Sequence, residues 1–454
     1  MPLSASPHIT HLLHLGITLS WGLFIRANAA EVTGSPETYG AKLDGTTNDR
    51  AALQSAIDAA HAAAGGGTVV VPAGRVLLTG SFALKSRVTP HLAPGSRILA
   101  STDPAHYRRV LVGAAHAEDI TITGSGVIDG RARDFMAGET PDIFQIGPFR
   151  PRVMLLEDCR RVRLRDFTTR DGFMRTVHLA GCDGVLVRGL TILNNLKIPN
   201  CDGIDPDCSR NVTVTDCHIE AGGDCIVIKT SRQFARYGPR ENIVVSNCIL
   251  KTRSTALKIG TETVNDIRNV VFSNCVVRDS HRAVGFWLRD PGSIENVVVS
   301  NRVSETRIHP KIWWGGAEAI YVSAHARTPG AKIGTLRNLR FSHILARGEV
   351  GVFIQGSSEC IPEDVHLNDV SVTLAKTTAI PTRHHVRTPD SLGVAEDVVI
   401  VGIHVTGARG VSLRDCTVRR APNPPATYGA TLRTLRVADF RNKGFRGADA
   451  RPSN

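Results

Sequence analysis

Short runs of aliphatic and β-branched residues that alternate with polar ones recur along most of the chain. Clear examples are NVTVTDCHI from residue 211, NIVVSNCIL from 242 and NVVFSNCVV from 269, and most such units follow one another at intervals of 23 to 33 residues. Alternation with a period of two residues is typical of β-strands with one buried face. Asn, Asp, Gly or Ser separates the two runs of each unit, which indicates turns between short strands.

The spacing of these units decides between repeat architectures. Leucine-rich repeats need regularly placed leucines, which are absent, and propeller blades need about 40 residues each. A coil of three short strands and three turns fits units of the observed length, and stacked coils pair strand on strand in parallel. The sequence therefore predicts an all-β fold, a single right-handed parallel β-helix that covers residues 30–440.

The two ends of such a solenoid differ in pattern from its coils. Residues 48–64 show helical spacing, with Leu53, Ile57 and His61 on one face and Asn48 or Asp49 as N-cap, and a run of three glycines follows. We interpret this helix as a cap, because an open first coil would expose an apolar edge. The basic, polar residues 441–454 are predicted to form a disordered tail.

The first residues carry a targeting pattern. Residues 12–25 form an apolar run, which the small-x-small sequence Ala27-Asn28-Ala29 follows. This arrangement resembles a secretory signal peptide, although no Lys or Arg precedes the run. The run is too short to span a bilayer and no later segment reaches membrane length. We therefore expect a signal peptide at 1–29, a secreted or periplasmic protein, and no membrane partner.

The charge balance narrows the choice of partner. The chain carries 54 Lys and Arg against 42 Asp and Glu, a net charge of +12, which is compatible with an acidic polymer or with a surface that is merely rich in arginine. Aromatic residues make up only 5% and the basic residues are scattered, which argues against nucleic acid. A polysaccharide or oligosaccharide is the expected partner, and we expect the protein to be a monomer.

The ten cysteines form no CxxC pair, so a zinc ribbon or a thioredoxin-like motif is not supported. Five cysteines recur directly after the Asp or Asn that separates the two runs of a unit, as expected of small buried residues stacked in a ladder. They are Cys159, Cys217, Cys248, Cys275 and Cys416. Cys201, Cys208 and Cys225 lie off that ladder, and an exported protein could pair two of them in a local disulfide. No His, Cys and Asp spacing is typical of a metal site, so neither a metal nor a cofactor is predicted.

Polar residues between 170 and 330 fall into two columns when the strands are aligned on their inward apolar pairs. Asp202 and Asp224 are 22 residues apart, about one coil, and adjacent strands lie about 4.8 Å apart. Two or three carboxylates within one or two coils suit the separation of about 6.5–9.5 Å that an inverting glycosidase needs. Aspartates at solenoid turns also cap backbone groups, and Asp207 is the one most expected to do only that. The entrance column holds Arg175, Asp202, Asp224, Thr255, Arg282 and Glu318, and the outward column holds His178, Asp205, Val227, Lys258, Gly285 and Tyr321.

The stretch CDGIDPDCSRNVTVTDCHIEAGGDCIVIKT at 201–230 resembles the signature of glycoside hydrolase family 28, the polygalacturonases. YGAKLDGTTNDRAALQSAIDAA at 39–60 and ITGSGVIDG at 122–130 are similar to that family's N-terminal coils. The resemblance implies a pectin-lyase-like right-handed β-helix and inverting, metal-free hydrolysis of galacturonic-acid polymers. It also implies that Asp202 and Asp224, which match the first and third catalytic aspartates, hold and deprotonate the attacking water.

The sequence departs from the family pattern at four positions. Gly223 stands where the family has its proton-donating aspartate, and Thr255 stands where it has a histidine. Gly285 and Trp287 occupy the positions of the Arg and Lys that hold the substrate carboxylate. The resemblance therefore covers the scaffold and the water-activating half of the site, and it leaves the proton donor open.

Three hypotheses follow from these departures. Another residue supplies the acid, for which His178, Asp205 and Glu318 are the candidates, since burial raises the pKa of a carboxylic acid towards the working pH. Alternatively the protein is a lyase that uses Lys229, Lys258 or Arg282 as base, or a binding protein without catalysis. The first hypothesis, a hydrolase of an acidic, pectin-like polysaccharide, is favoured.

Aromatic residues beside the predicted cleft favour a sugar ligand. The sequence WWGG places two tryptophans next to each other, and their opposite parity exposes one of them to stack on a sugar ring. Asp202, Asp224 and Asp205 are the predicted catalytic residues. The predicted substrate-binding residues are His178, Lys229, Lys258, Arg282, Trp313, Trp314 and Glu318.

Overall fold

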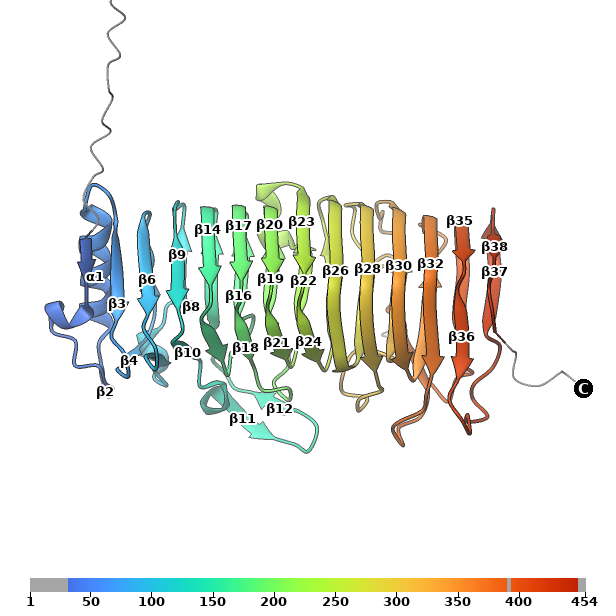
Figure 1. Ribbon diagram of the computed structural model, residues 1–454, viewed down its shortest axis with the longest axis horizontal. Coiled ribbons are helices and arrows are strands. Elements are labelled where there is room, and N and C mark those ends of the chain that lie inside the picture. Colours follow the sequence, from blue (N-terminus) through green and yellow to red (C-terminus); the bar gives the residue numbers. More distant parts are fainter. Residues whose placement is uncertain (1–31, 390–392, 448–454) are drawn as a thin grey trace, which may run out of the picture.

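The computed structural model describes residues 32–389 and 393–447, which form the predicted parallel β-helix. Thirty-four strands belong to one continuous set of parallel pairings, and each coil contributes strands to three stacks (Figure 1). The signal peptide predicted at 1–29 lies outside the described residues. Within the described part, no helix is long and apolar enough to span a membrane.

The first stack forms the face that carries the site. Its strands are β5 (Phe82–Ala83), β8 (Val110–Ala115), β13 (Arg152–Glu157), β16 (Val177–Ala180), β19 (Ile204–Asp207), β22 (Ile226–Thr230), β25 (Thr255–Thr263), β27 (Arg282–Leu288), β29 (Glu318–Ala324), β31 (Val350–Gln355), β35 (Ile403–Arg414) and β37 (Leu432–Ala438).

The second stack runs through β1 (Val32–Gly34), β3 (Gly67–Val71), β6 (Val88–Leu92), β9 (Thr121–Gly124), β14 (Arg160–Arg165), β17 (Asp183–Arg188), β20 (Arg210–Thr215), β23 (Arg240–Ser246), β26 (Ile267–Ser280), β28 (Ile294–Thr306), β30 (Leu336–Gly348), β32 (Glu363–Leu374), β35 and β38 (Arg441–Lys443). The third contains β2 (Asp44–Asn48), β4 (Val76–Thr79), β7 (Arg97–Ala100), β10 (Val127–Asp129), β15 (Thr168–Arg170), β18 (Thr191–Leu193), β21 (His218–Ala221), β24 (Ile249–Thr252) and β36 (Thr417–Arg420). The long strands β26, β28, β30 and β32 bend from the second stack into the third.

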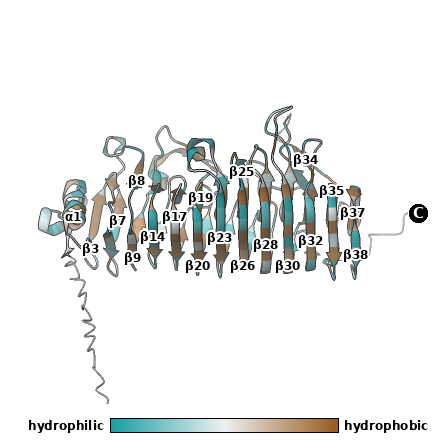
Figure 2. Ribbon diagram, turned by 90° about the horizontal axis from the view of Figure 1, so that it is seen from above, coloured by the Kyte–Doolittle hydropathy of each residue, from teal (hydrophilic) through white to brown (hydrophobic). Residues whose placement is uncertain are grey.

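The core consists of aliphatic ladders, because the coils stack in register. Ile204 pairs with Ile226, Ile226 with Leu257 and Leu257 with Val284, and all four side chains are buried. Hydrophobic and polar positions alternate along the strands, as Figure 2 shows by colour. This is the two-residue period from which the fold was predicted.

The turns are held by an asparagine ladder on the outside of the solenoid. Asn211, Asn242, Asn269, Asn296 and Asn338 each open a repeat unit with φ between 53° and 60°, in the left-handed region that asparagine tolerates. The side-chain amides of the last four each donate a hydrogen bond to the amide oxygen of the preceding asparagine, with N···O distances of 2.6–3.2 Å, and that of Asn211 donates to Asp183 Oδ1. The repeated asparagine therefore sets both the turn and its alignment with the next coil.

All ten cysteines are free, so the local disulfide considered for Cys201, Cys208 and Cys225 is absent. The ladder interpretation of Cys217, Cys248 and Cys275 agrees with their complete or nearly complete burial. These thiols fill space at the same corner of successive coils, as small hydrophobic residues do.

The two ends of the solenoid are finished differently. At the N-terminal end lies α1 (Arg50–Ala62), which buries Leu53 and Ile57. Its N-cap residue Asp49 accepts hydrogen bonds from the backbone N–H groups of Lys42 and Leu43, both at 2.8 Å, rather than from the helix. At the other end β38 pairs with β35, so the expected boundary at residue 440 falls inside the last coil. Among the described residues, β37 pairs on one side only.

Short 3-10 helices and two antiparallel hairpins leave the coils. The helices are η1 (Pro36–Tyr39), η2 (Pro104–His106), η3 (Ala132–Phe135) and η4 (Arg232–Tyr237). The hairpins are β11 (Met136–Glu139) with β12 (Phe144–Ile146), and β33 (Arg383–His385) with β34 (Val394–Glu396). The helix η1 packs against α1, while β34 lies on the same side of the solenoid as β19 and β25 of the first stack (Figure 2).

Two buried arginines in the coils make a matched test of stability. Arg302 is 2% exposed, and among the residues that the structure describes its Nε and Nη1 have no hydrogen-bond partner and no carboxylate pairs with it. Arg282 is equally buried but forms an ion pair with Glu318. We expect Arg302→Met to leave the free energy of unfolding unchanged or raise it by about 1–3 kcal/mol, and Arg282→Met to lower it by about 3–5 kcal/mol. Calorimetric melting of both variants checks this, and a large loss of stability in Arg302→Met would contradict it.

Candidate functional site

Three insertions from distant parts of the chain join into a wall beside the first stack. The indole Nε1 of Trp313 donates a hydrogen bond to the backbone oxygen of Asp142 in the β11–β12 hairpin, at 3.2 Å. In the β33–β34 hairpin, Arg383 Nε donates to the backbone oxygen of Gly315 at 2.9 Å, and Glu396 pairs with Lys311 at 3.1 Å. The segment 309–316 therefore lies between the two hairpins and is bonded to both.

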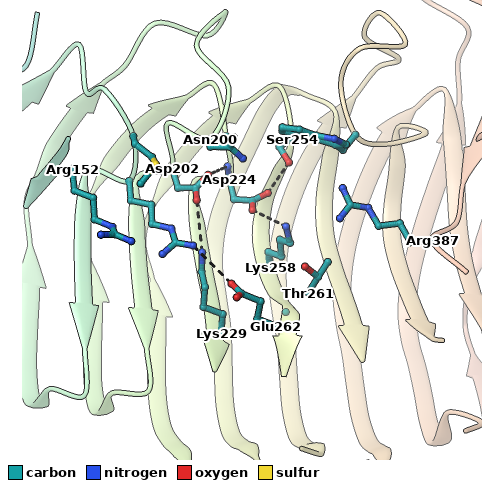
Figure 3. A pocket seen from close by; sticks show the side chains of 15 residues that line it. Arg152, Asn200, Asp202, Asp224, Lys229, Ser254, Lys258, Thr261, Glu262 and Arg387 are labelled. Atoms are coloured by element: carbon teal, nitrogen blue, oxygen red, sulfur yellow. Dashed lines mark hydrogen bonds and ion pairs between the residues drawn. The ribbon is translucent and has the colours of Figure 1, made fainter. Parts of the chain in front are cut away.

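A cavity of about 420 Å³ lies between this wall and the first stack (Figure 3). Five of the predicted site residues line it, namely Asp202, Asp224, Lys229, Lys258 and Trp314. The other lining residues are Arg152, Met174, Arg175, Asn200, Gly223, Ser254, Gly260, Thr261, Glu262 and Arg387. The cavity is strongly polar, with cationic side chains around the two aspartates.

The strand register places the predicted columns as the sequence alignment does. Ile204 pairs with Ile226, which sets Asp202 and Asp224 on neighbouring coils two residues before the paired positions. The link is direct, because the backbone N–H of Asp224 donates a hydrogen bond to Asp202 Oδ1 at 2.9 Å. The carboxyl group of Asp202 is thus bonded to the backbone of Asp224, and both residues line the cavity.

Asp224 is surrounded by donors that stabilise its ionised form. Lys258 Nζ lies 2.8 Å from Oδ2, while the Ser254 hydroxyl and the Thr255 N–H donate to Oδ1 at 2.7 and 3.1 Å. Burial raises the pKa of Asp224, but the charge and hydrogen bond of Lys258 and the hydroxyl of Ser254 outweigh it, so the pKa is lowered. Asp224 is therefore a carboxylate at neutral pH.

Asp202 has the opposite environment. Burial, followed by the charge of Asp205, raises the pKa of Asp202 to about 7, while Lys229 acts against this rise from 3.8 Å. Lys229 itself lies closer to Asp205, with which it forms an ion pair. Asp202 therefore retains its proton to a higher pH than its neighbour on the next coil.

Gly223 is confined by the carboxyl group of Asp202. A Cβ atom at residue 223 would lie 2.0 Å from Asp202 Oδ1 and 3.1 Å from the Asp202 backbone nitrogen. No side chain fits there while Asp202 keeps this orientation. The place that an aspartate at 223 would enter is occupied by the carboxyl group of Asp202.

Asp205 and His178 lie beneath the floor of the cavity rather than in its lining. Asp205 is fully buried, with Lys229 as ion-pair partner and Arg175 Nε at 3.6 Å. His178 is also fully buried; its Nε2 lies 3.2 Å from Asp207 Oδ2, and burial lowers its pKa to about 4. Neither residue reaches a ligand in the cavity directly, so their predicted roles in catalysis and substrate binding do not fit their positions.

Glu318 and Trp313 are likewise buried outside the lining of this cavity, whereas Arg282 lines a small adjoining cavity. Arg282 Nε lies 2.5 Å from Glu318 Oε2 in a fully buried ion pair, which holds Glu318 ionised with a lowered pKa. Glu318 therefore cannot serve as the acid. Trp313 is 2% exposed and holds the β11–β12 hairpin, whereas Trp314 is half-buried and lines the cavity. One tryptophan of the pair faces the ligand space, as their opposite parity predicts.

Sequence reasoning missed several lining residues. Arg152 precedes the aligned coils, and Arg387 lies in the insertion between β33 and β34, where no repeat pattern exists. Glu262 and Ser254 are on or next to β25, at positions outside the two aligned columns. In the sequence, Arg152 could have been found from the arginine-containing stretch at 148–152, and Glu262 from the GTET sequence after Ile259.

Within the described residues, no group of three or more His, Cys, Asp or Glu is arranged to hold a metal ion.

The fold and the site define a parallel β-helix protein whose surface cleft is centred on two hydrogen-bonded aspartates. The model of glycosyl hydrolases family 28 matches residues 65–388, and the chain belongs to this family. A "Probable polygalacturonase" of Vitis vinifera is 28% identical over 266 residues, which are 51% of this chain and 52% of the relative. A polygalacturonase of Chamaecyparis obtusa is 28% identical over 202 residues, or 43% of this chain and 39% of the relative. The chain thus spans about half or less of the length of these curated relatives.

Solved structures show the same fold at low sequence identity. A hyperthermoactive exopolygalacturonase from Thermotoga maritima has a TM-score of 0.65 at 23% identity, covering 76% of this chain and 87% of that chain. A family 28 exopolygalacturonase from Yersinia enterocolitica has a TM-score of 0.70 at 18% identity, covering 90% of this chain and 78% of that chain. Both likenesses concern the β-helix itself.

Asp207 provides a test that separates structural from chemical aspartates in the motif. Its buried carboxylate accepts hydrogen bonds from the Ser231 N–H at 2.9 Å and the Ser231 hydroxyl at 2.6 Å. We expect Asp207→Asn to lower the free energy of unfolding by about 2–4 kcal/mol, since one acceptor oxygen becomes a donor among donors. Asp216→Asn, at an exposed turn, should change it by less than about 0.5 kcal/mol. Thermal melting compares the two, and equal melting temperatures would contradict the structural role of Asp207.

Proposed function

We propose that the protein is a glycosidase that hydrolyses an acidic, pectin-like polysaccharide with inversion at the anomeric carbon. The observation that carries the proposal is the contrast between Asp202 and Asp224, two hydrogen-bonded neighbours in the cleft whose surroundings shift their pKa values in opposite directions. A pair of carboxyl groups with separated pKa values supplies an acid and a base at the same pH.

In this mechanism Asp202 is the acid. Its proton goes to the glycosidic oxygen as the bond from that oxygen to the anomeric carbon breaks. Asp224 takes a proton from water, and the water oxygen forms the new bond to the anomeric carbon. The proton later returns from Asp224 to Asp202 through solvent. Asp202 thereby takes the role for which the family has an aspartate at position 223, whose place its carboxyl group occupies.

The surrounding residues support binding of a charged sugar. Lys258 lies beside Asp224, and the half-buried face of Trp314 stands in the wall, where an indole can stack on a sugar ring. Asp205 acts on Asp202 through its charge, which makes it a positioning residue. We further propose that the apolar run at 12–25 directs export to the periplasm or the exterior, where cell-wall pectin is found, and that the protein acts as a monomer.

Products and variants test the proposal together. Incubation with a panel of pectic oligosaccharides, followed by mass analysis, should show hydrolysis products from the wild type. We expect Asp202→Asn and Asp224→Asn each to lower kcat about 100- to 10,000-fold, because each removes one proton-transfer group. Asp216→Asn, on the far turn, is the matched control and should retain full activity. Full activity in both site variants would refute the assignment.

The same panel separates the alternative functions. Products that carry an unsaturated, ultraviolet-absorbing sugar would identify a lyase. Binding of oligosaccharides without any release of products would identify a binding protein that has lost catalysis. Hydrolysis products that disappear in the Asp224→Asn variant would support the proposed function.

The pH dependence tests which aspartate is the acid. Since Asp202 must be protonated and has a pKa of about 7, kcat/KM should fall as the pH rises above about 7. The charge of Asp205 raises the pKa of Asp202, so Asp205→Asn should move this alkaline limb to lower pH. A pH–rate profile of both proteins, with Asp216→Asn as control, measures the shift. An alkaline limb that stays in place or moves upward would exclude Asp202 as the acid.

A further inference from the structure

Most of the charged side chains in the cleft are paired with one another. Lys258 is bonded to Asp224, Lys229 to Asp205, and Arg175 lies 3.6 Å from Asp205 and 3.8 Å from Glu262. Two arginines that line the same cavity differ from these, since the guanidinium groups of Arg152 and Arg387 form no ion pair or hydrogen bond within the described residues. Asp224 acts on Arg387, and Asp205 and Asp207 act on Arg152, only through their charges and without a bond.

Arg387 extends from the wall towards the cavity (Figure 3). It also lines a small adjoining cavity together with Lys258, Trp287 and Trp314, which places it beside β25 and β27. Burial and the nearby charge of Arg282 lower its pKa. A cation that is partly buried among other cations, without a partner, is destabilising unless an anion binds there.

Arg152 stands at the other side of the two aspartates (Figure 3). It begins β13, which is two strands before β19 in the first stack. Its Nε is buried without a hydrogen-bond partner, and its pKa is lowered by burial and by the charges of Arg175 and Arg109. This guanidinium therefore has the same unmet need for an anion as Arg387.

We propose that Arg152 and Arg387 each bind a carboxylate of the polymer, so that the cleft takes uronate residues on both sides of the bond that is cleaved. The inference rests on the proposed function and names the charge pattern of its substrate. From β13 to β27 there are five strand spacings, or roughly 24 Å, which suits an oligosaccharide lying along the solenoid axis. Planar guanidinium groups bind carboxylates in two parallel hydrogen bonds.

Arg387 also accounts for a departure of this sequence from its family. At residues 285 and 287, where family members hold the substrate carboxylate, this chain has Gly285 and Trp287. A Cβ at Gly285 would lie 2.4 Å from the Trp287 ring, which fills that space. Lys258 lies 5.1 Å from the centre of the same ring. Arg387 and Trp287 line the same small cavity, so in this proposal the carboxylate is bound from the wall rather than from the coil.

The test compares acidic and esterified substrates. With de-esterified oligogalacturonate, we expect Arg387→Gln and Arg152→Gln each to raise KM about 10- to 100-fold with a much smaller change in kcat. With the fully methyl-esterified oligosaccharide, both variants should resemble the wild type. Arg387→Lys should restore part of the preference for the acid. Arg188→Gln, which removes one positive charge on the exposed end of β17, is the matched control and should leave KM unchanged.

Two outcomes separate this inference from the proposed function. If the wild type hydrolyses the acidic substrate and both glutamine variants change KM less than twofold, with melting temperatures near that of the wild type, the inference is overturned. If the wild type hydrolyses nothing, the proposed function fails, and calorimetric binding of oligogalacturonate then decides the inference alone. A 10-fold loss of affinity in both glutamine variants would support it, and unchanged affinity would overturn it.

Discussion

Every distance in the site depends on the in-register parallel pairing of successive coils. Backbone hydrogen bonds hold neighbouring strands about 4.8 Å apart, and the aliphatic ladders prevent a shift by one residue, because such a shift would turn the buried side chains outward. Asp202 and Asp224 are neighbours for this reason alone, although they are 22 residues apart in the chain. The asparagine ladder repeats the same constraint on the outside of the turns.

Given this spacing, the chemistry of each carboxyl group is decided by its partners. Lys258, Ser254 and the Thr255 N–H surround Asp224, and Asp202 has Asp205 beneath it. The lysine that approaches Asp202 is bound to Asp205 instead. The closer lysine and the two hydrogen bonds at Asp224, and the charge of Asp205 at Asp202, therefore shift the pKa values of two equally buried aspartates in opposite directions. Because residue 223 is a glycine, the carboxyl group of Asp202 can occupy the space that a side chain at residue 223 would fill.

The coils of the β-helix could be predicted from the sequence, but the insertions that form the wall beside the first stack could not. Period-two alternation and the spacing of the units predicted the β-helix and the columns, because these features repeat, while helical spacing at 48–64 predicted the cap helix. The columns separated Asp224 from Asp205, but they did not show that Asp205 is fully buried, since parity gives the direction of a side chain and not what covers it. Nor did the columns show that His178 and Glu318 are fully buried, or that Arg282 is held in an ion pair with Glu318. Arg387 and the wall could not be predicted, as insertions carry no period that aligns them with the coils.

The two ends of the solenoid differ in how they oppose end-to-end association of copies of the protein at high concentration. A parallel strand that pairs on one side only can template another chain, and within residues 32–389 and 393–447 β37 is such a strand. Its residues include the exposed Arg433 and Arg436, and β38 beside it adds Arg441 and Lys443. A second copy, itself of net charge +12, would have to bring its own positive surface against this edge. Growth of fibres by end-to-end stacking is thereby opposed at one end by like charge and at the other by the helix.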